Sequence, residues 1–168
     1  VFSRLPGAVL HLLWKDLAPV RSDKGLALLP TTSFADAPPR FDVLFVPGGS
    51  GQIELMDDET VLAFLRDRGT TARYVTSVCT GSLVLAAAGL LQGKRATCHW
   101  SSIDQLALLG AEPVAERVVR DGNCITGAGV TSGIDFALVV AAEVAGRSVA
   151  EDIQLSIEYD PAPPFAAG

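Results

Sequence analysis

The stretch RYVTSVCTGSLVLAAAGLL, residues 73–91, changes from strand-forming to helix-forming residues within a few positions. Its first part, up to residue 78, is mostly β-branched and aromatic, which favours a strand, and its second part is rich in alanine and leucine, which favours a helix. Cys79 lies at the junction. In an α/β sheet such a junction places its side chain beyond the carboxyl end of a strand, which is where ligands bind.

The rest of the chain repeats this alternation of strand and helix. FDVLFVP (41–47) is a continuous apolar run between Pro-Pro and Gly-Gly, as expected of a buried parallel strand. Further strands are predicted over residues 8–14, 73–78, 94–98 and 123–129, a hairpin over 20–34, and helices over 57–68, 80–91, 102–109, 131–145 and 148–158. Gly69 is expected to end the first helix, and the proline-rich tail 160–168 is expected to be irregular. The pattern predicts one α/β domain over residues 1–168, with a doubly wound, mostly parallel sheet flanked by helices.

The composition narrows the class of protein. The 168 residues are 49% hydrophobic and 19% charged, which is typical of a compact domain. The net charge of -6 disfavours binding to nucleic acid or to an anionic membrane, and no apolar run is long enough to span a bilayer. The three cysteines form no C-x-x-C pair and the N-terminus has no secretory pattern, so we expect a cytoplasmic location and neither disulfides nor structural zinc.

Cys79 is the candidate catalytic residue, because a helix N-terminus and its backbone N–H groups favour the nucleophilic thiolate. The small residues 80–82 leave room for a tight turn and for a substrate. Gly48 and Gly49 follow the strand 41–47, and we expect their unhindered N–H groups at the same sheet edge, where such donors stabilise negative charge on a substrate. The alternative for Cys79 is a buried structural cysteine, and the neighbouring residues alone do not decide between the two.

His99 is the candidate for orienting the nucleophile or for exchanging a proton with it. It follows the predicted strand 94–98, and it would reach Cys79 if that strand were the neighbour of the strand before Cys79. The alternative is a structural histidine held by hydrogen bonds. Cys98 and Cys124 lie within or beside predicted strands with no such turn after them, so we expect them to fill the core. The sequence contains no glycine-rich nucleotide-binding motif.

Several segments together resemble the PfpI/ThiJ superfamily, which has the class I glutamine-amidotransferase-like fold. They are HLLWK (11–15), TTSFADAPP (31–39), VPGG (46–49), VCTGSLVLAAAGLLQGKRATCHW (78–100), ERVVRDGNCITGAGVTSGIDFAL (116–138) and EYDPAPPFAAG (158–168). The cysteine segment with its His-Trp end is also typical of the amidotransferase-like domains of AraC-type transcription regulators. The final segment favours the isonitrile hydratase branch of the superfamily.

The resemblance implies an enzyme that hydrates an isonitrile, R–N≡C, to the N-substituted formamide. Cys79 would be the nucleophile, and the backbone N–H groups of Gly49 and Thr80, with Gly48 beside them, would line the pocket that stabilises negative charge. The resemblance further implies a homodimer that acts on a small-molecule isonitrile and needs no metal and no organic cofactor.

The chain departs from the family pattern at both ends and at Ala128. Family members have a strand and a helix before the counterpart of His11, with an acidic residue that touches the cysteine, and they also have a C-terminal helical extension. Ala128 stands where relatives usually have glycine. We therefore expect a truncated homologue that is less stable and less active than a longer form. The other activities that remain open are those of a glyoxalase, a deglycase, an amidase, or the sensory domain of an AraC-type regulator.

Overall fold

The structure, a computed structural model, describes residues 1–165, and the chain forms two compact units. The larger unit is His11–Phe136, and the smaller unit combines Val1–Leu10 with the chain from Ala137 onward. Helix α5 (Ser132–Ala145) begins in the larger unit and continues in the smaller one. The single domain predicted over residues 1–168 remains a prediction.

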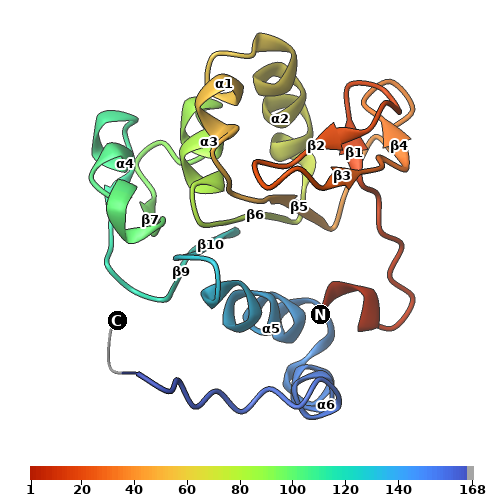
Figure 1. Ribbon diagram of the computed structural model, residues 1–168, viewed down its shortest axis with the longest axis vertical. Helices are drawn as coiled ribbons and strands as arrows, with labels where there is room; N and C mark the ends of the chain where they lie inside the picture. Colours follow the sequence, from red (N-terminus) through yellow and green to blue (C-terminus); the bar gives the residue numbers. More distant parts are fainter. Residues whose placement is uncertain (166–168) are drawn as a thin grey trace. The chain divides into compact units, whose positions relative to one another are not determined.

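A four-stranded sheet with the order β5-β6-β10-β9 forms the centre of the larger unit (Figure 1). Its strands are β5 (Val43–Val46), β6 (Tyr74–Val78), β9 (Val118–Asp121) and β10 (Cys124–Gly127). The strands β5, β6 and β10 are parallel, and β9 runs antiparallel to β10. The predicted mostly parallel sheet is therefore confirmed, and the carboxyl ends of its three parallel strands meet at one edge.

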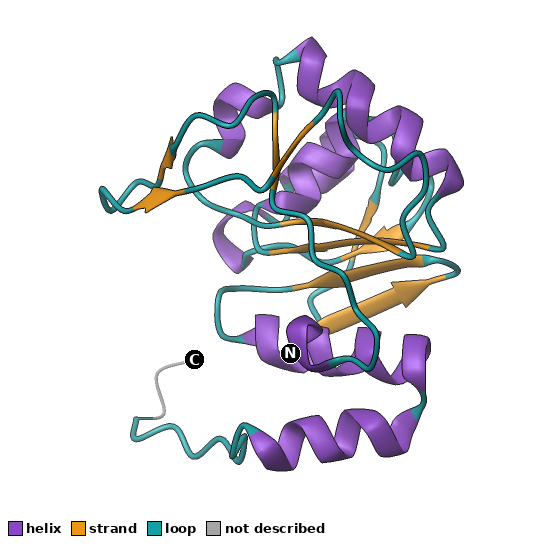
Figure 2. Cartoon of the chain, turned by 90° about the vertical axis from the view of Figure 1, so that its right-hand side faces the viewer, coloured by secondary structure: helices purple, strands orange, loops and turns teal. Residues whose placement is uncertain are grey.

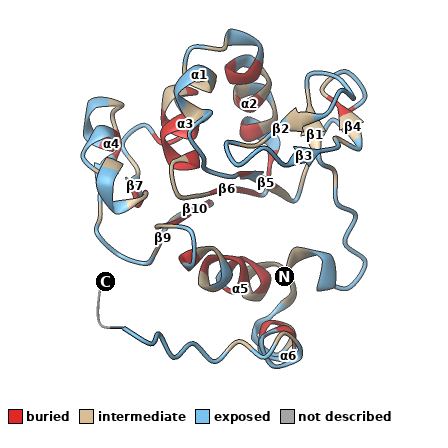
Figure 3. Cartoon of the chain, viewed as in Figure 1, coloured by how far each residue is buried: buried red, intermediate tan, exposed pale blue. Residues whose placement is uncertain are grey.

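Helices α2 (Glu59–Thr71) and α3 (Gly81–Ala87) pack on one face of this sheet and share its main apolar core. Six of the seven residues of α3 are buried (Figure 3). Full burial of a leucine or valine side chain contributes about 1.5–3 kcal/mol, so packing rather than intrinsic propensity holds this short helix. On the opposite face, the ring of Phe136 in α5 stacks on Phe45 of β5 with centroids 5.6 Å apart.

Short strand pairs and helices complete the larger unit (Figure 2). The strand pairs are β1 (Leu13–Trp14) with β4 (Thr32–Ser33), β2 (Val20–Arg21) with β3 (Ala27–Leu28), and β7 (Arg95–Ala96) with β8 (Glu112–Pro113). The short helices are α1 (Gln52–Leu55), η2 (Trp100–Ser102) and α4 (Gln105–Leu108). The antiparallel pair β2–β3 confirms the predicted hairpin, whereas α4 covers only part of the helix predicted over residues 102–109.

Several predicted strands differ from the structure. Within residues 8–14 only β1 is a strand, and within residues 94–98 only β7 is a strand. Each has two residues, because its pairing partner, β4 or β8, is a two-residue strand outside the central sheet. The strand predicted over 41–47 as a buried parallel strand is parallel to β6 but lies at the end of the four-stranded sheet, and Phe45 is 38% exposed. The sequence-based prediction lacks β9, whose four residues include an arginine and an aspartate.

Gly69 does not end helix α2, which continues to Thr71. Gly69 is buried, and a Cβ built on it would lie 2.6 Å from Cδ2 of Leu90. Glycine at this position therefore allows a close approach between α2 and the segment after α3, and it is not a stop signal. The helix predicted over residues 80–91 ends at Ala87.

The smaller unit is built on α5 and α6 (Arg147–Ser156), which confirms the helices predicted over 131–145 and 148–158. A turn of 3-10 helix, η1, covers Phe2–Arg4. The buried core of this unit consists of Leu138, Ala141, Ala150 and Ile153, with Val1 and Leu5 among the residues packed against it. Residues 160–165 contain no helix or strand, as expected of the tail, whose last three residues lie outside the described part of the chain. Within residues 1–165, no helix is both long and apolar enough to cross a membrane.

Gly81 allows α3 to approach the end of β5. A Cβ at this position would lie 2.2 Å from Val46 O and 2.7 Å from Pro47 O, and neither backbone oxygen can move aside without shifting the chain. We expect Gly81→Ala to lower the free energy of unfolding by about 3 kcal/mol. Urea denaturation followed by circular dichroism measures this loss.

Gly51→Ala is the matched control for this substitution. A Cβ on Gly51 would meet no atom within 4 Å, and the φ of Gly51, -61°, suits alanine. We expect the free energy of unfolding to change by less than about 1 kcal/mol. Equal losses in the two variants would contradict the argument that the close approach at Gly81 is what matters.

Candidate active site

Cys79 lies on a sharp turn between β6, which ends at Val78, and α3, which begins at Gly81. Its φ is 59°, a left-handed backbone conformation that is rare for residues other than glycine. Such a conformation costs on the order of 1–3 kcal/mol and persists only when the surrounding structure imposes it. The predicted position of Cys79 at a strand-to-helix junction, beyond the carboxyl end of a parallel strand, is confirmed.

The backbone N–H of Cys79 is held by the chain that follows β10. It donates to Gly127 O at 3.0 Å and to Ala128 O at 2.8 Å. Ala128 in turn donates its N–H to Arg117 O at 3.0 Å, and the Arg117 Nε donates to Asp135 Oδ2 at 2.6 Å. These contacts join the turn to the end of β10, to the residue just before β9 and to α5, and no local sequence pattern around Cys79 predicts them.

The Gly48–Gly49 loop contacts the turn at Cys79 directly. A Cβ on Gly48 would lie 2.7 Å from Cys79 Cβ and 2.7 Å from Thr80 N. No larger residue fits there without moving the backbone, so this glycine is required by the close approach of two loops. The structure therefore brings together four of the five predicted site residues: Gly48, Gly49, Cys79 and Thr80.

The hydroxyl of Thr80 ties the turn to the glycine loop. Thr80 Oγ1 accepts the N–H of Gly49 at 3.0 Å and lies 3.3 Å from Gly49 O, to which it donates. The N–H of Gly49 is therefore already hydrogen-bonded within the protein. In contrast, the N–H of Thr80 has no acceptor among residues 1–165, which leaves it as a donor for a bound anion. The predicted roles of both groups in stabilising substrate charge remain predictions.

Burial separates Cys79 from the other two cysteines. All three are free thiols, and Cys79 is half-buried whereas Cys98 is 1% and Cys124 is 3% exposed. Burial raises the pKa of the Cys98 thiol to about 11, and it raises the pKa of the Cys124 thiol as well. The expectation that Cys98 and Cys124 fill the core is confirmed, and both stay protonated near neutral pH.

His99 does not follow a strand that neighbours β6, so the premise of its predicted role is wrong. The neighbour of β6 on that side is β10, and β7 pairs with β8 instead. A Cβ on Gly129 would lie 3.3 Å from Cδ2 of His99, so the ring packs on the chain just after β10. Within residues 1–165, neither ring nitrogen is hydrogen-bonded to Cys79.

The Nδ1 atom of His99 has local partners. It accepts the backbone N–H of Ser101 at 3.3 Å and lies 2.8 Å from Ser101 Oγ, so the imidazole caps the 3-10 helix η2. This arrangement supports the structural alternative for His99. Its predicted part in proton transfer remains a prediction.

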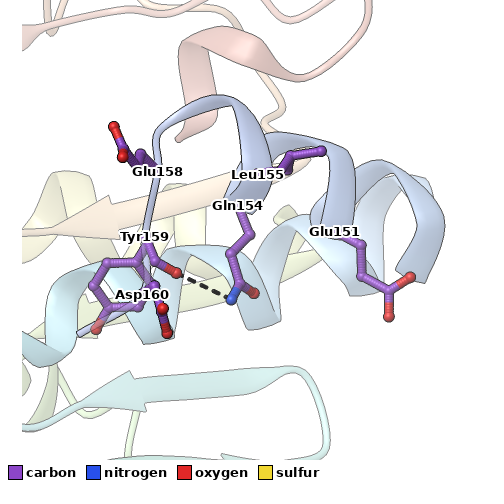
Figure 4. A pocket seen from close by; sticks show the side chains of 6 residues that line it. All are labelled: Glu151, Gln154, Leu155, Glu158, Tyr159 and Asp160. Carbon is purple, nitrogen blue, oxygen red and sulfur yellow. Dashed lines mark hydrogen bonds between the residues drawn. The ribbon is translucent and has the colours of Figure 1, made fainter. Parts of the chain in front are cut away.

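A pocket of about 470 Å³ lies in the smaller unit, and none of the predicted site residues lines it. Its lining residues are Glu151, Gln154, Leu155, Glu158, Tyr159 and Asp160 (Figure 4). The Gln154 side chain donates to the Tyr159 carbonyl at 3.2 Å, and the three carboxylates point in different directions. Among the described residues, no three His, Cys, Asp or Glu side chains gather as metal ligands would.

Three parallel strands, a strained cysteine at the turn after the central one, and a glycine loop packed against that turn occur together in this fold. This combination is typical of a class of α/β proteins. The DJ-1/PfpI family profile matches residues 2–143, and the chain belongs to this family.

Three individual proteins of the family show how similar this chain is to known relatives. The chain is 60% identical over 168 residues to isonitrile hydratase of Pseudomonas putida, matching along its full length and spanning 73% of that protein. It is 32% identical over 141 residues to protein DJ-1alpha of Drosophila melanogaster. This match covers 82% of this chain and 65% of that protein. A crystal structure of a THiJ/PfpI family protein from Pseudomonas syringae superposes with a TM-score of 0.97 at 54% identity, covering 99% of this chain and 69% of that one.

The raised pKa of Cys98 makes the stability of the fold depend on alkaline pH. The unfolded chain loses the Cys98 proton near the ordinary value of 9.0, whereas the folded chain keeps it until about pH 11. In that window the unfolded state binds fewer protons, so the free energy of unfolding falls as the pH rises. We expect the wild type to lose about 2–3 kcal/mol more than Cys98→Ala between pH 9 and pH 11.

Urea denaturation of both proteins at pH 7, 9, 10 and 11 measures this difference. The values at pH 7 give the cost of the cavity left by Cys98→Ala, which is independent of the thiol titration. Parallel curves for the two proteins from pH 9 to pH 11 would contradict the raised pKa.

The Thr80 hydroxyl holds the glycine loop against the turn, so its removal is expected to loosen the site. Thr80→Val keeps the side-chain shape but deletes both hydrogen bonds to Gly49, whereas Thr80→Ser keeps the hydroxyl. We expect Thr80→Val to lower kcat/KM for the enzyme's substrate by about tenfold or more, and Thr80→Ser by less than about threefold. Steady-state kinetics measures both, and a loss in Thr80→Ser equal to or larger than that in Thr80→Val would contradict the role of the hydroxyl.

Proposed function

We propose that this chain is an isonitrile hydratase in which Cys79 is the nucleophile. The observation that carries the substrate class is the 60% identity, along the full length of this chain, to isonitrile hydratase of Pseudomonas putida. The geometry supports the role of Cys79, because its thiol is the half-buried one and its backbone is held in a strained turn next to the N–H of Thr80, which has no acceptor among residues 1–165.

The reaction begins at the terminal carbon of the isonitrile, which is electrophilic. The Cys79 thiolate forms a bond to this carbon, and the carbon becomes negatively charged. An acid protonates the same carbon, which gives the thioimidate R–N=CH–S–Cys79. Water then adds to that carbon and the nitrogen takes up a proton. Cleavage of the carbon–sulfur bond releases the formamide R–NH–CHO and regenerates the thiolate, and the proton of the added hydroxyl returns to the conjugate base of the acid.

The residues around Cys79 have separate tasks in this scheme. The N–H of Thr80 lies at the turn and donates to the developing negative charge, because it has no acceptor among the described residues. Gly48 lets its loop lie directly against Cys79 Cβ and Thr80 N, which keeps the loop beside the turn that carries the sulfur. His99, whose ring packs on Gly129 close to the chain that holds Cys79, is the candidate for delivering the proton.

We further propose a cytoplasmic homodimer with a small-molecule isonitrile as its substrate and no nucleic-acid or membrane partner. The family resemblance supports the dimer, and the absence of any C-x-x-C pair supports a reducing compartment. Sedimentation equilibrium gives the oligomeric state directly.

Cys79→Ser is expected to abolish hydration, because a serine hydroxyl at this position is far less nucleophilic than a thiolate. We expect turnover of a simple alkyl isonitrile to fall on the order of a thousandfold. Formamide formation followed by proton NMR measures the rate. The matched controls are Cys98→Ala and Cys124→Ala, which are expected to keep turnover within about fivefold at temperatures where both variants remain folded.

The outcomes separate the proposals. A loss in Cys98→Ala or Cys124→Ala as large as that in Cys79→Ser would overturn the assignment of the nucleophile. A wild-type chain that makes no formamide would overturn the activity, and the sensory domain of an AraC-type regulator would then be the next function to test.

A further inference from the structure

Two serines are buried directly beneath the turn that carries Cys79. Ser77 belongs to β6 and Ser82 to α3, and both side chains are 0% exposed. Their Oγ atoms lie 2.8 Å apart, so one hydroxyl donates to the other. This hydrogen bond joins the strand before the turn to the helix after it, with Cys79 and Thr80 between its ends.

The pair lies where an apolar pair would be expected. The other buried residues of α3 are glycine, alanine, valine and leucines, and Ser82 is its one buried hydroxyl. Val75, two positions before Ser77 on the same face of β6, is part of the apolar core. Two buried hydroxyls contribute little net stability compared with a well-packed apolar pair of similar shape. Their presence at this point therefore calls for a role other than core stability.

The backbone between the two serines supplies that role. Cys79 has a φ of 59°, which relaxes unless both flanks of the turn are fixed. On the strand side, Ser77 is in register with Val46 of β5 and with Thr126 of β10. On the helix side, the N–H of Leu83 donates to Thr80 O at 3.0 Å, but the only backbone contact to Cys79 O among the described residues is the N–H of Ser82 at 3.5 Å. The side-chain hydrogen bond is thus the short link across the turn.

We propose that Ser77 and Ser82 are positioning residues that hold Cys79 in its reactive orientation. This inference rests on the proposed function for its kinetic readout, and it goes beyond it by assigning a task to two buried hydroxyls that bond to each other. The buried hydrogen bond acts as a brace, and the strain of the turn is stored because the brace prevents the backbone from relaxing.

A comparison of Ser77→Ala, Ser82→Ala and the double variant separates positioning from mere stability. Each single variant leaves one buried hydroxyl without its partner, which destabilises the fold, whereas the double variant removes both hydroxyls and recovers much of the stability. Positioning is not recovered, because no variant has the brace. We therefore expect kcat to fall by about tenfold or more in all three, with KM changed by less than about threefold.

Thr97→Val is the matched control. Thr97 is 1% exposed, and its Oγ1 has no hydrogen-bond partner among the described residues, so valine removes a buried hydroxyl of the same core without removing a hydrogen bond. We expect its kcat to stay within about twofold of the wild type. Thermal unfolding of every variant shows that the assays are run on folded protein.

The rate at which iodoacetamide alkylates Cys79 tests the brace without any isonitrile. Mass spectrometry of the peptide that contains Cys79 follows the modification. We expect alkylation in the double variant to be at least about fivefold slower than in the wild type and in Thr97→Val, because a relaxed turn moves the sulfur from the exposed edge of the sheet.

Three results would overturn the inference: wild-type kcat and alkylation in the double variant, kcat that recovers together with stability in the double variant, or an equal loss in Thr97→Val. If the wild type turns over no isonitrile, the proposed function fails by itself. The alkylation rates then decide the inference alone.

Discussion

The left-handed backbone of Cys79 is the constraint around which the larger unit is organised. A cysteine does not hold a φ of 59° unaided, and two separate parts of the chain impose it. The carbonyls of Gly127 and Ala128 hold its N–H, and Gly48 packs against its Cβ. The two carbonyls lie at the end of β10, and Gly48 follows the end of β5. The parallel order of β5, β6 and β10 is therefore what makes the turn possible.

Glycine and burial together set the chemistry at this turn. Gly48 and Gly81 let the chain at the end of β5 approach the turn and the start of α3 to distances that no side chain allows. This close approach fixes the N–H of Thr80 beside Cys79 Cβ. Burial acts on the other two thiols in the opposite sense, since it raises the pKa of Cys98 and of Cys124 and keeps them protonated. A chain with three free cysteines thus presents a single half-buried thiol at the strand ends.

The sequence predicts the parts of this arrangement that depend on local patterns. The runs 41–47 and 73–91 show a strand with a glycine loop and a strand-to-helix junction, and both occur in the structure. Pairings between distant residues are not encoded locally. The side chain of Thr80 occupies the N–H of Gly49 from 31 positions away, and β10 rather than β7 lies beside β6. The ring of His99 consequently packs on the chain after β10, which no propensity or spacing reveals.

The amide protons of Cys79 and Thr80, which are adjacent in the turn, differ in their hydrogen bonding. The amide of Cys79 is shared between two carbonyl oxygens, whereas that of Thr80 has no acceptor within the described chain. Exchange of the first with solvent deuterium requires the turn to open, and exchange of the second does not. In an NMR spectrum, the amide resonance of Cys79 thus reports on the rigidity of the turn, and the amide resonance of Thr80 reports on the occupancy of the site beside it.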